Sequence, residues 1–273
     1  MAGMGISGTL SRRTAALTVA AVLLLAGCGG GSDQGDGDRA GDKAKGGSDG
    51  RGDRDTVGDG GGPRGGSAKH PANRASPPAV STRIPDVGDT LQSRIPDRSR
   101  QVLAVYGEGE NSARATAVLY VKRGENWHRD RSWAAHNGRR GWTVDHEEND
   151  LRSPVGVFTL SDAGGVLPDP GARLPYDADA AFAAPRYWPK TYWNDFDYVI
   201  AIDYNRVRGT SPLDPTRPRG QREGGGIWLH LDHGSGTSAC VSLPKSGMEY
   251  LLKTLDPARH PVVVMGDKAH LAD

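Results

Sequence analysis

The sequence predicts a mainly β domain with few helices, placed after a polar, glycine-rich segment. Three observations indicate this. From about residue 98, short runs rich in β-branched and aromatic residues alternate with Gly, Pro, Asn and Asp. One clear helical pattern occurs, near the C-terminus. Residues 28–79 contain almost no large apolar side chain and cannot offset their ordering entropy by burial. We therefore expect a disordered linker over 28–79 and a folded domain over 80–273, with its core at about 98–266.

The N-terminus has the features of a bacterial export signal. Arg12 and Arg13 precede an apolar run over 15–26, which is too short to span a bilayer. The run ends at Gly27-Cys28 in a sequence that resembles a lipobox, the motif whose cysteine is acylated. We expect a signal peptide over 1–27 and a protein anchored through lipidated Cys28 to the outer face of the bacterial cell membrane. The alternative is an ordinary signal cleaved near Gly27, with no lipid.

The charge balance gives no indication of a nucleic-acid partner. Removing the signal takes Arg12 and Arg13 from 34 Lys and Arg residues, against 33 Asp and Glu residues, and leaves a net charge of −1. No basic patch stands out from the mixed background. We expect no nucleic-acid binding and a monomer.

The expected strands are short and follow one another along the domain. Their ranges are 101–106, 115–121, 156–160, 198–202, 226–231, 240–243 and 261–265. The helix is expected over 246–254, because Met248, Leu251 and Leu252 recur at helical spacing, and Ser246 is its expected cap. No internal repeat is present.

The cysteine count draws attention to Cys240. The chain has two cysteines, and Cys28 is assigned to the lipid. An odd cysteine in an exported protein indicates intermolecular pairing or a reactive thiol. The alternative is a buried cysteine that behaves as a small apolar residue.

A histidine precedes this cysteine on a neighbouring expected strand. His230 lies on the face opposite Ile227 and Leu229, and a glycine-rich turn separates it from Cys240. A short connection can bring the two side by side on one face, where histidine would take the thiol proton. A structural histidine and an inert cysteine are the alternative.

These residues resemble the YkuD-type L,D-transpeptidase catalytic domain family. Residues 227–230, Ile-Trp-Leu-His, match its strand and histidine, and residues 237–241, Thr-Ser-Ala-Cys-Val, match its cysteine segment. Residues 153–158, Ser-Pro-Val-Gly-Val-Phe, resemble its strand entry, and His136-Asn137-Gly138-Arg139 resembles a subgroup. The resemblance covers most of 98–266 and implies a β-sandwich or barrel-like catalytic domain.

The resemblance implies an acyl-transfer reaction on peptidoglycan stem peptides. Cys240 would be the nucleophile and His230 its base, with backbone N–H groups at Ala239 and Cys240 as the oxyanion hole. His233 is the secondary candidate for the base, since His233-Gly234 matches the family's His-Gly dipeptide. No cofactor or metal is expected. Candidate substrate contacts are Trp228, Ser238, Ser242, Tyr187 and Trp188.

Two positions depart from the family pattern. Ala239 stands where glycine is usual and would be strained if the backbone needed a positive φ, and Ser242 stands where many members have arginine. Two further hypotheses stay open: a hydrolase, such as an L,D-carboxypeptidase or amidase, and a cell-wall-binding domain without turnover. The acidic stretch over 145–150 is interpreted as a polar loop.

Overall fold

The computed structural model describes residues 81–273 as a mainly β domain with few helices. The expected signal peptide, lipidated Cys28 and the linker over 28–79 lie outside the described residues. Within the described range, no helix is both long and apolar enough to cross a membrane.

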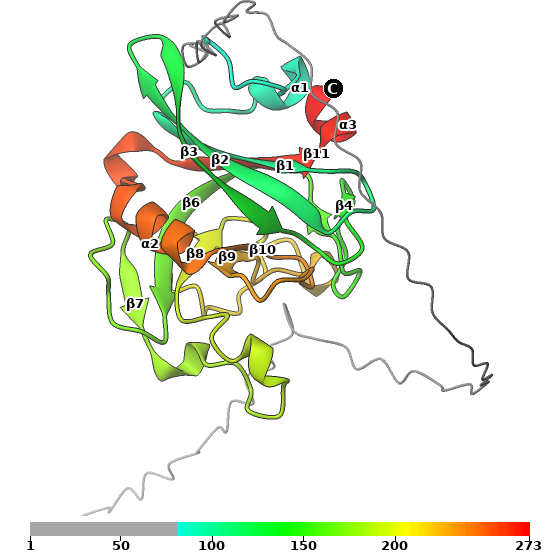
Figure 1. Cartoon of the computed structure of the whole chain (residues 1–273), viewed down its shortest axis with the longest axis vertical. Helices are drawn as coiled ribbons and strands as arrows, with labels where there is room; N and C mark the ends of the chain where they lie inside the picture. The colour runs from blue at the N-terminus through cyan, green and yellow to red at the C-terminus, as the bar shows by residue number, and fades with distance from the viewer. Residues whose placement is uncertain (1–80) are drawn as a thin grey trace, which may run out of the picture.

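A closed barrel forms the body of the domain (Figure 1). Its strands follow the order β11 (Val262–Asp267), β1 (Gln101–Gly107), β2 (Arg114–Arg123), β3 (Asn126–His136), β10 (Val241–Leu243), β9 (Trp228–Leu231), β8 (Val199–Ile202) and β6 (Gly156–Gly165). A pairing between β6 and β11 closes the ring. Strand β7 (Tyr176–Ala178) adds to β6, and β4 (Trp142–Thr143) pairs separately with β5 (Ser153–Pro154). Most neighbours are antiparallel, but β1–β11, β9–β10, β6–β7 and β4–β5 are parallel.

All seven strands expected from the sequence are present, with ends that differ by a few residues. The long strand β3 was not predicted. Its middle residues, including Arg129, Asp130 and Arg131, are exposed to solvent, so it lacks the apolar alternation of its neighbours. Strands β4, β5 and β7 are too short to produce a pattern.

The predicted helix is confirmed as α2 (Lys245–Thr254). Its expected cap is wrong: Pro244 occupies the N-cap position, and Ser246 lies inside the first turn. Two shorter helices, α1 (Asp89–Gln92) and α3 (Lys268–Ala272), lie beside each other next to β1 and β11 (Figure 1). Single 3-10 turns occur at Ala180–Phe182, Lys190–Tyr192, Gln221–Glu223 and Pro257–Arg259.

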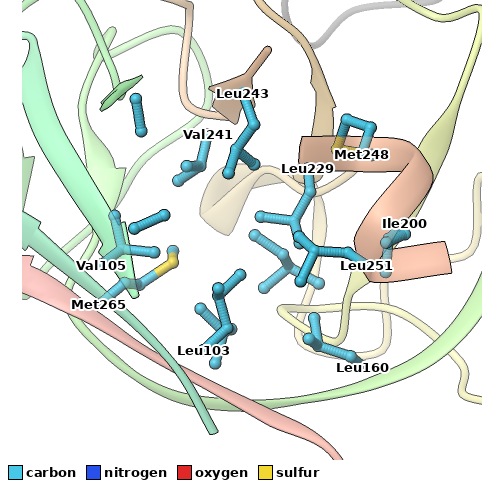
Figure 2. Close-up of a cluster of buried hydrophobic side chains, with 14 of the residues drawn as sticks. Leu103, Val105, Leu160, Ile200, Leu229, Val241, Leu243, Met248, Leu251 and Met265 are labelled. Carbon is cyan, nitrogen blue, oxygen red and sulfur yellow. The ribbon is translucent and has the colours of Figure 1, made fainter. Parts of the chain in front are cut away.

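The barrel interior and α2 share one hydrophobic core (Figure 2). The inward side chains alternate along each strand, as the two-residue period of a strand requires. Examples are Leu103 and Val105 on β1 and Leu229 on β9, which lie in the same cluster as Met248 and Leu251 of α2.

Two further apolar clusters cover the outside of the barrel. One joins Val102 and Val264, on β1 and β11, to Leu91 of α1 and Leu271 of α3. Because residues from Ile84 to Leu271 contribute to it, the packed domain extends beyond the expected core of 98–266. The other cluster lies on the outer face of β8 and β9 and contains the predicted nucleophile, Cys240.

Candidate active site

The site is built on the first residues of two parallel strands. Strands β9 and β10 pair in parallel, with Ser242 opposite His230. The expectation that Cys240 and His230 lie side by side is therefore wrong in its register. Cys240 lies two residues before Ser242 and therefore on the same sheet face as His230. The two residues are offset by about 6.6 Å along the strand direction. Both side chains point away from the barrel interior, as the alternation predicted.

The sulfur of Cys240 lies against the backbone at the start of β9. The backbone N–H of Trp228 donates to Sγ at 3.3 Å, and the carbonyl oxygen of Gly226 lies 3.8 Å from Sγ. A backbone donor at this place would favour a thiolate over a thiol.

Two hydroxyl groups fix the segment that ends at Cys240. Ser153 Oγ donates to the carbonyl oxygen of Ala239 at 2.6 Å and accepts the N–H of Gly138 at 2.9 Å. Thr237 Oγ1 donates to the carbonyl oxygen of Cys240 at 2.6 Å. Ala239 does not adopt a positive φ, so alanine is not strained at this position.

These contacts also orient the candidate oxyanion donor. The carbonyl of Ala239 and the N–H of Cys240 belong to one trans peptide unit, so they point in opposite directions. Since the carbonyl points to Ser153, the N–H of Cys240 points away from Ser153. The hydroxyl of Ser153 thus aims a backbone donor without contacting any reacting atom.

His230 has its proton on a defined nitrogen. Its Nδ1 lies 2.8 Å from the carbonyl oxygen of Leu231, and a carbonyl can only accept, so Nδ1 carries the hydrogen. The Nε2 atom is then the basic one, and it is buried without a hydrogen-bond partner in the described part of the chain. Burial disfavours the imidazolium and lowers the pKa of His230, against the attraction of Asp195. The lowered pKa favours the neutral imidazole.

The pKa of His233 is shifted in the opposite direction. Its Nδ1 lies 2.9 Å from Oδ2 of the buried Asp195. Burial disfavours its charged form, but the hydrogen bond and attraction to Asp195 are together stronger, and the pKa of His233 is raised. Its ring lies 4.5 Å from the ring of Tyr192 and 6.3 Å from that of His230. His233 is thus better suited to hold a proton than to remove one.

Asp232 was not predicted, although it joins two of the motifs named from the sequence. Its Oδ1 accepts from Ser242 Oγ at 2.7 Å and lies 2.8 Å from Nδ1 of His136. Burial raises its pKa, but these two partners outweigh it, so the pKa of Asp232 is lowered. The sequence signal was its position two residues after His230, where a strand places it on the same face.

The structure separates the five candidate substrate contacts. Trp228 packs between Phe182 and Phe196, and Ser242 is engaged by Asp232. The substrate contacts predicted for these two residues stay predictions. The others are more accessible: Tyr187 is 86% exposed, and Trp188 and Ser238 are half-buried.

The acidic stretch over 145–150 forms the expected loop between β4 and β5. His146 is buried there, 2.9 Å from Asp150, with its ring against Tyr204. Among residues 81–273, no group of three His, Cys, Asp or Glu side chains is placed to hold a metal ion.

Comparison with known proteins assigns no family. No protein-family model matches the chain, and no curated protein matches it. It is similar to a solved structure titled "Structure of Bdellovibrio bacteriovorus Bd1075", with a TM-score of 0.36 and 16% identity. The match covers 61% of this chain and 48% of that one, about half of its length. At this TM-score the likeness supports no statement about function.

Proposed function

We propose that this protein is a cysteine-dependent L,D-transpeptidase of the YkuD type, acting on peptidoglycan stem peptides. The observation that carries the proposal is His230. Its Nδ1 is occupied by a carbonyl oxygen, and its basic Nε2 is buried, without a partner in the described chain, on the sheet face that also presents Cys240.

The offset between base and nucleophile does not argue against catalysis. His230 lies on the strand next to Cys240, offset by two residues along it. In structures without substrate, catalytic hydrogen bonds are often long and tighten when the substrate binds. The N–H of Trp228 at the sulfur supports the thiolate, and the oriented N–H of Cys240 supports a tetrahedral oxyanion.

The reaction begins from the thiol of Cys240. Nε2 of His230 takes the thiol proton, and the sulfur attacks the carbonyl carbon that precedes the terminal D-Ala. The C–N bond breaks, the proton passes from His230 to the departing amine, and a thioester remains on Cys240. An acceptor amine then attacks the thioester carbonyl and gives its proton to His230, and the thiol is restored. Water in place of the amine would give hydrolysis.

The proposal includes a location. A lipid on Cys28 would hold the domain at the outer face of the membrane, with the segment over 28–79 as a tether towards the cell wall. Two acyl chains are sufficient for stable anchoring, where one binds only marginally.

Incubation of reduced protein with a disaccharide-tetrapeptide, beside its Cys240→Ala form, tests the function. We expect D-Ala release and an amine-linked product from the native chain, and neither from the variant. D-Ala release with a hydrolysed tripeptide alone would instead identify a carboxypeptidase. Folded protein that binds the substrate without releasing D-Ala would support a wall-binding domain.

A further inference from the structure

A cavity of about 170 Å³ lies where the chain enters β11, beside the strand β6 that pairs with it. Its wall comes from four separate parts of the chain: the segment before β1, the first half of β6, the loop after β8 and the turn before β11. Three prolines, Pro96, Pro257 and Pro261, restrict the backbone of this wall. None of the residues placed at Cys240 and His230 lines the cavity, so it is separate from the candidate active site.

The charged side chains on the wall are all basic. Arg98, Arg208 and His260 line the cavity, and each of them is exposed to solvent. Nη1 of Arg208 donates to Oγ1 of Thr159 at 3.4 Å, which places the guanidinium against the wall. Among the described residues, no Asp or Glu lines the cavity. An anion that enters it would therefore meet positive or neutral groups.

The carboxylates behind this wall are already engaged. Asp203 accepts hydrogen bonds from the hydroxyl groups of Thr159 and Ser161. The buried guanidinium of Arg206 forms ion pairs with both Asp203 and Asp162. Burial also raises the pKa of Asp203, against the effect of these partners, and so lessens the negative charge there. The two arginines on the wall thus outnumber the charge that remains behind it.

Ser99 gives the wall a buried polar group that the chain leaves unsatisfied. The residue is 1% exposed, and its Oγ has no hydrogen-bond partner within residues 81–273. Its backbone is fixed, since its N–H donates to Pro96 and its carbonyl oxygen accepts from Arg100. A buried hydroxyl without a partner is destabilising, so its presence points to a partner from outside the chain. One bridging water would need far less space than this cavity offers.

We propose that this cavity binds a phosphate group, free or as an ester, through Arg98 and Arg208, with the Ser99 hydroxyl and a ring N–H of His260 as further donors. Guanidinium groups present planar forks that suit phosphate oxygens. A tetrahedral anion offers acceptors in several directions, which matches donors from separate segments, whereas a carboxylate offers its acceptors in one plane. Because both arginines are exposed, the substituent of an ester can remain in solvent. The site does not depend on the proposed transpeptidase activity.

The test is calorimetric titration of the full-length protein in a phosphate-free buffer of constant ionic strength. The probes are sodium phosphate, glycerol 3-phosphate as a monoester, glycerophosphoglycerol as a diester, and sodium acetate. Each is titrated into the native chain and into Arg98→Met, Arg208→Met and Ser99→Ala. Arg140→Met, which removes an exposed arginine in the loop after β3, is the matched control. The thermal midpoint of each variant is measured without any added anion.

We expect phosphate to bind more tightly than acetate, and each arginine substitution to weaken phosphate binding by about 10-fold or more, with Arg140→Met unchanged. Ser99→Ala should weaken it several-fold while the midpoint without phosphate stays the same or rises, because the lost hydroxyl has no partner in the chain. Binding of the monoester or the diester identifies the form in which the group is carried. Acetate binding as tight as that of phosphate, or no phosphate binding, would overturn the inference. So would an equal loss in Arg140→Met, or a lower midpoint in Ser99→Ala with unchanged phosphate affinity.

Discussion

The two outer faces of the barrel are both covered, but by different chemistry. Over β1 and β11 the cover is aliphatic, with Leu91 and Leu271 on two short helices. Over β8 and β9 the cover is aromatic, and the strands beneath it present Cys240 and His230. The comparison indicates that the first face stabilises the domain, while the second holds polar groups whose hydrogen-bonding capacity is partly unused.

His230→Gln is expected to have the largest effect, a loss of turnover. Removing a general base typically lowers turnover by about 10²–10⁴-fold, while glutamine keeps a polar side chain at a buried place. We expect that loss in kcat, measured by D-Ala release, with a thermal midpoint close to that of the native chain. His128→Gln, at a half-buried position on β3, is the control. A loss of turnover no larger than that caused by His233→Gln would show that His230 is not the base.

Leu271→Ala tests the aliphatic face. Leu271 is 1% exposed, and truncating a buried leucine costs about 2–5 kcal/mol through lost burial and the cavity left behind. Urea unfolding should show this loss in the free energy of unfolding, with unchanged turnover per folded molecule at low temperature. A fall in kcat without a fall in stability would mean that the two faces are not separate in function.

Ser153→Ala should affect both stability and activity, at a smaller scale. It leaves the carbonyl of Ala239 and the N–H of Gly138 without their partner, at a cost of about 1–3 kcal/mol. Turnover should fall as well, because the peptide unit that aims the Cys240 N–H is released. Ser132→Ala, which removes an exposed hydroxyl bonded to Arg129, is the control and should change neither quantity.

Asp195→Asn should produce the smallest effect, visible in the pH dependence of stability. The pKa of His233 is raised in the folded state, so its contribution is complete below about 6.5, the unfolded value, and is lost as pH rises through the folded pKa. The variant should therefore lower the thermal midpoint more at pH 5.5 than at pH 9. An equal decrease at both pH values would show that the ion pair does not titrate as described.

Local patterns were sufficient to predict the interior strands and α2, because apolar alternation and helical spacing are properties of neighbouring residues. Strand β3 escaped prediction because its outer face is hydrated. The parallel register of β9 and β10 depends on where the loop over 232–240 returns, which no local pattern specifies.

The residues of the candidate site likewise fall into those that a local pattern predicts and those that only the folded structure brings together. Cys240, His230 and His233 follow from residue type and spacing. Asp195, which sets the pKa of His233, lies 38 residues away in the sequence, and the Ser153 contact to Ala239 spans 86 residues. Such partners come together only through the closure of the barrel.

The central claim is that His230 activates Cys240, and alkylation of the reduced protein tests it without any assumption about substrate. The rate at which iodoacetamide labels Cys240 is followed from pH 5 to pH 9 by mass spectrometry of its peptide, in the native chain and in His230→Gln. We expect native Cys240 to be labelled at least several-fold faster than Cys240 of the variant at neutral pH, and the variant to react appreciably only near the ordinary thiol pKa of about 8.5. Superimposable pH profiles would contradict it, because His230 would then have no influence on the thiol.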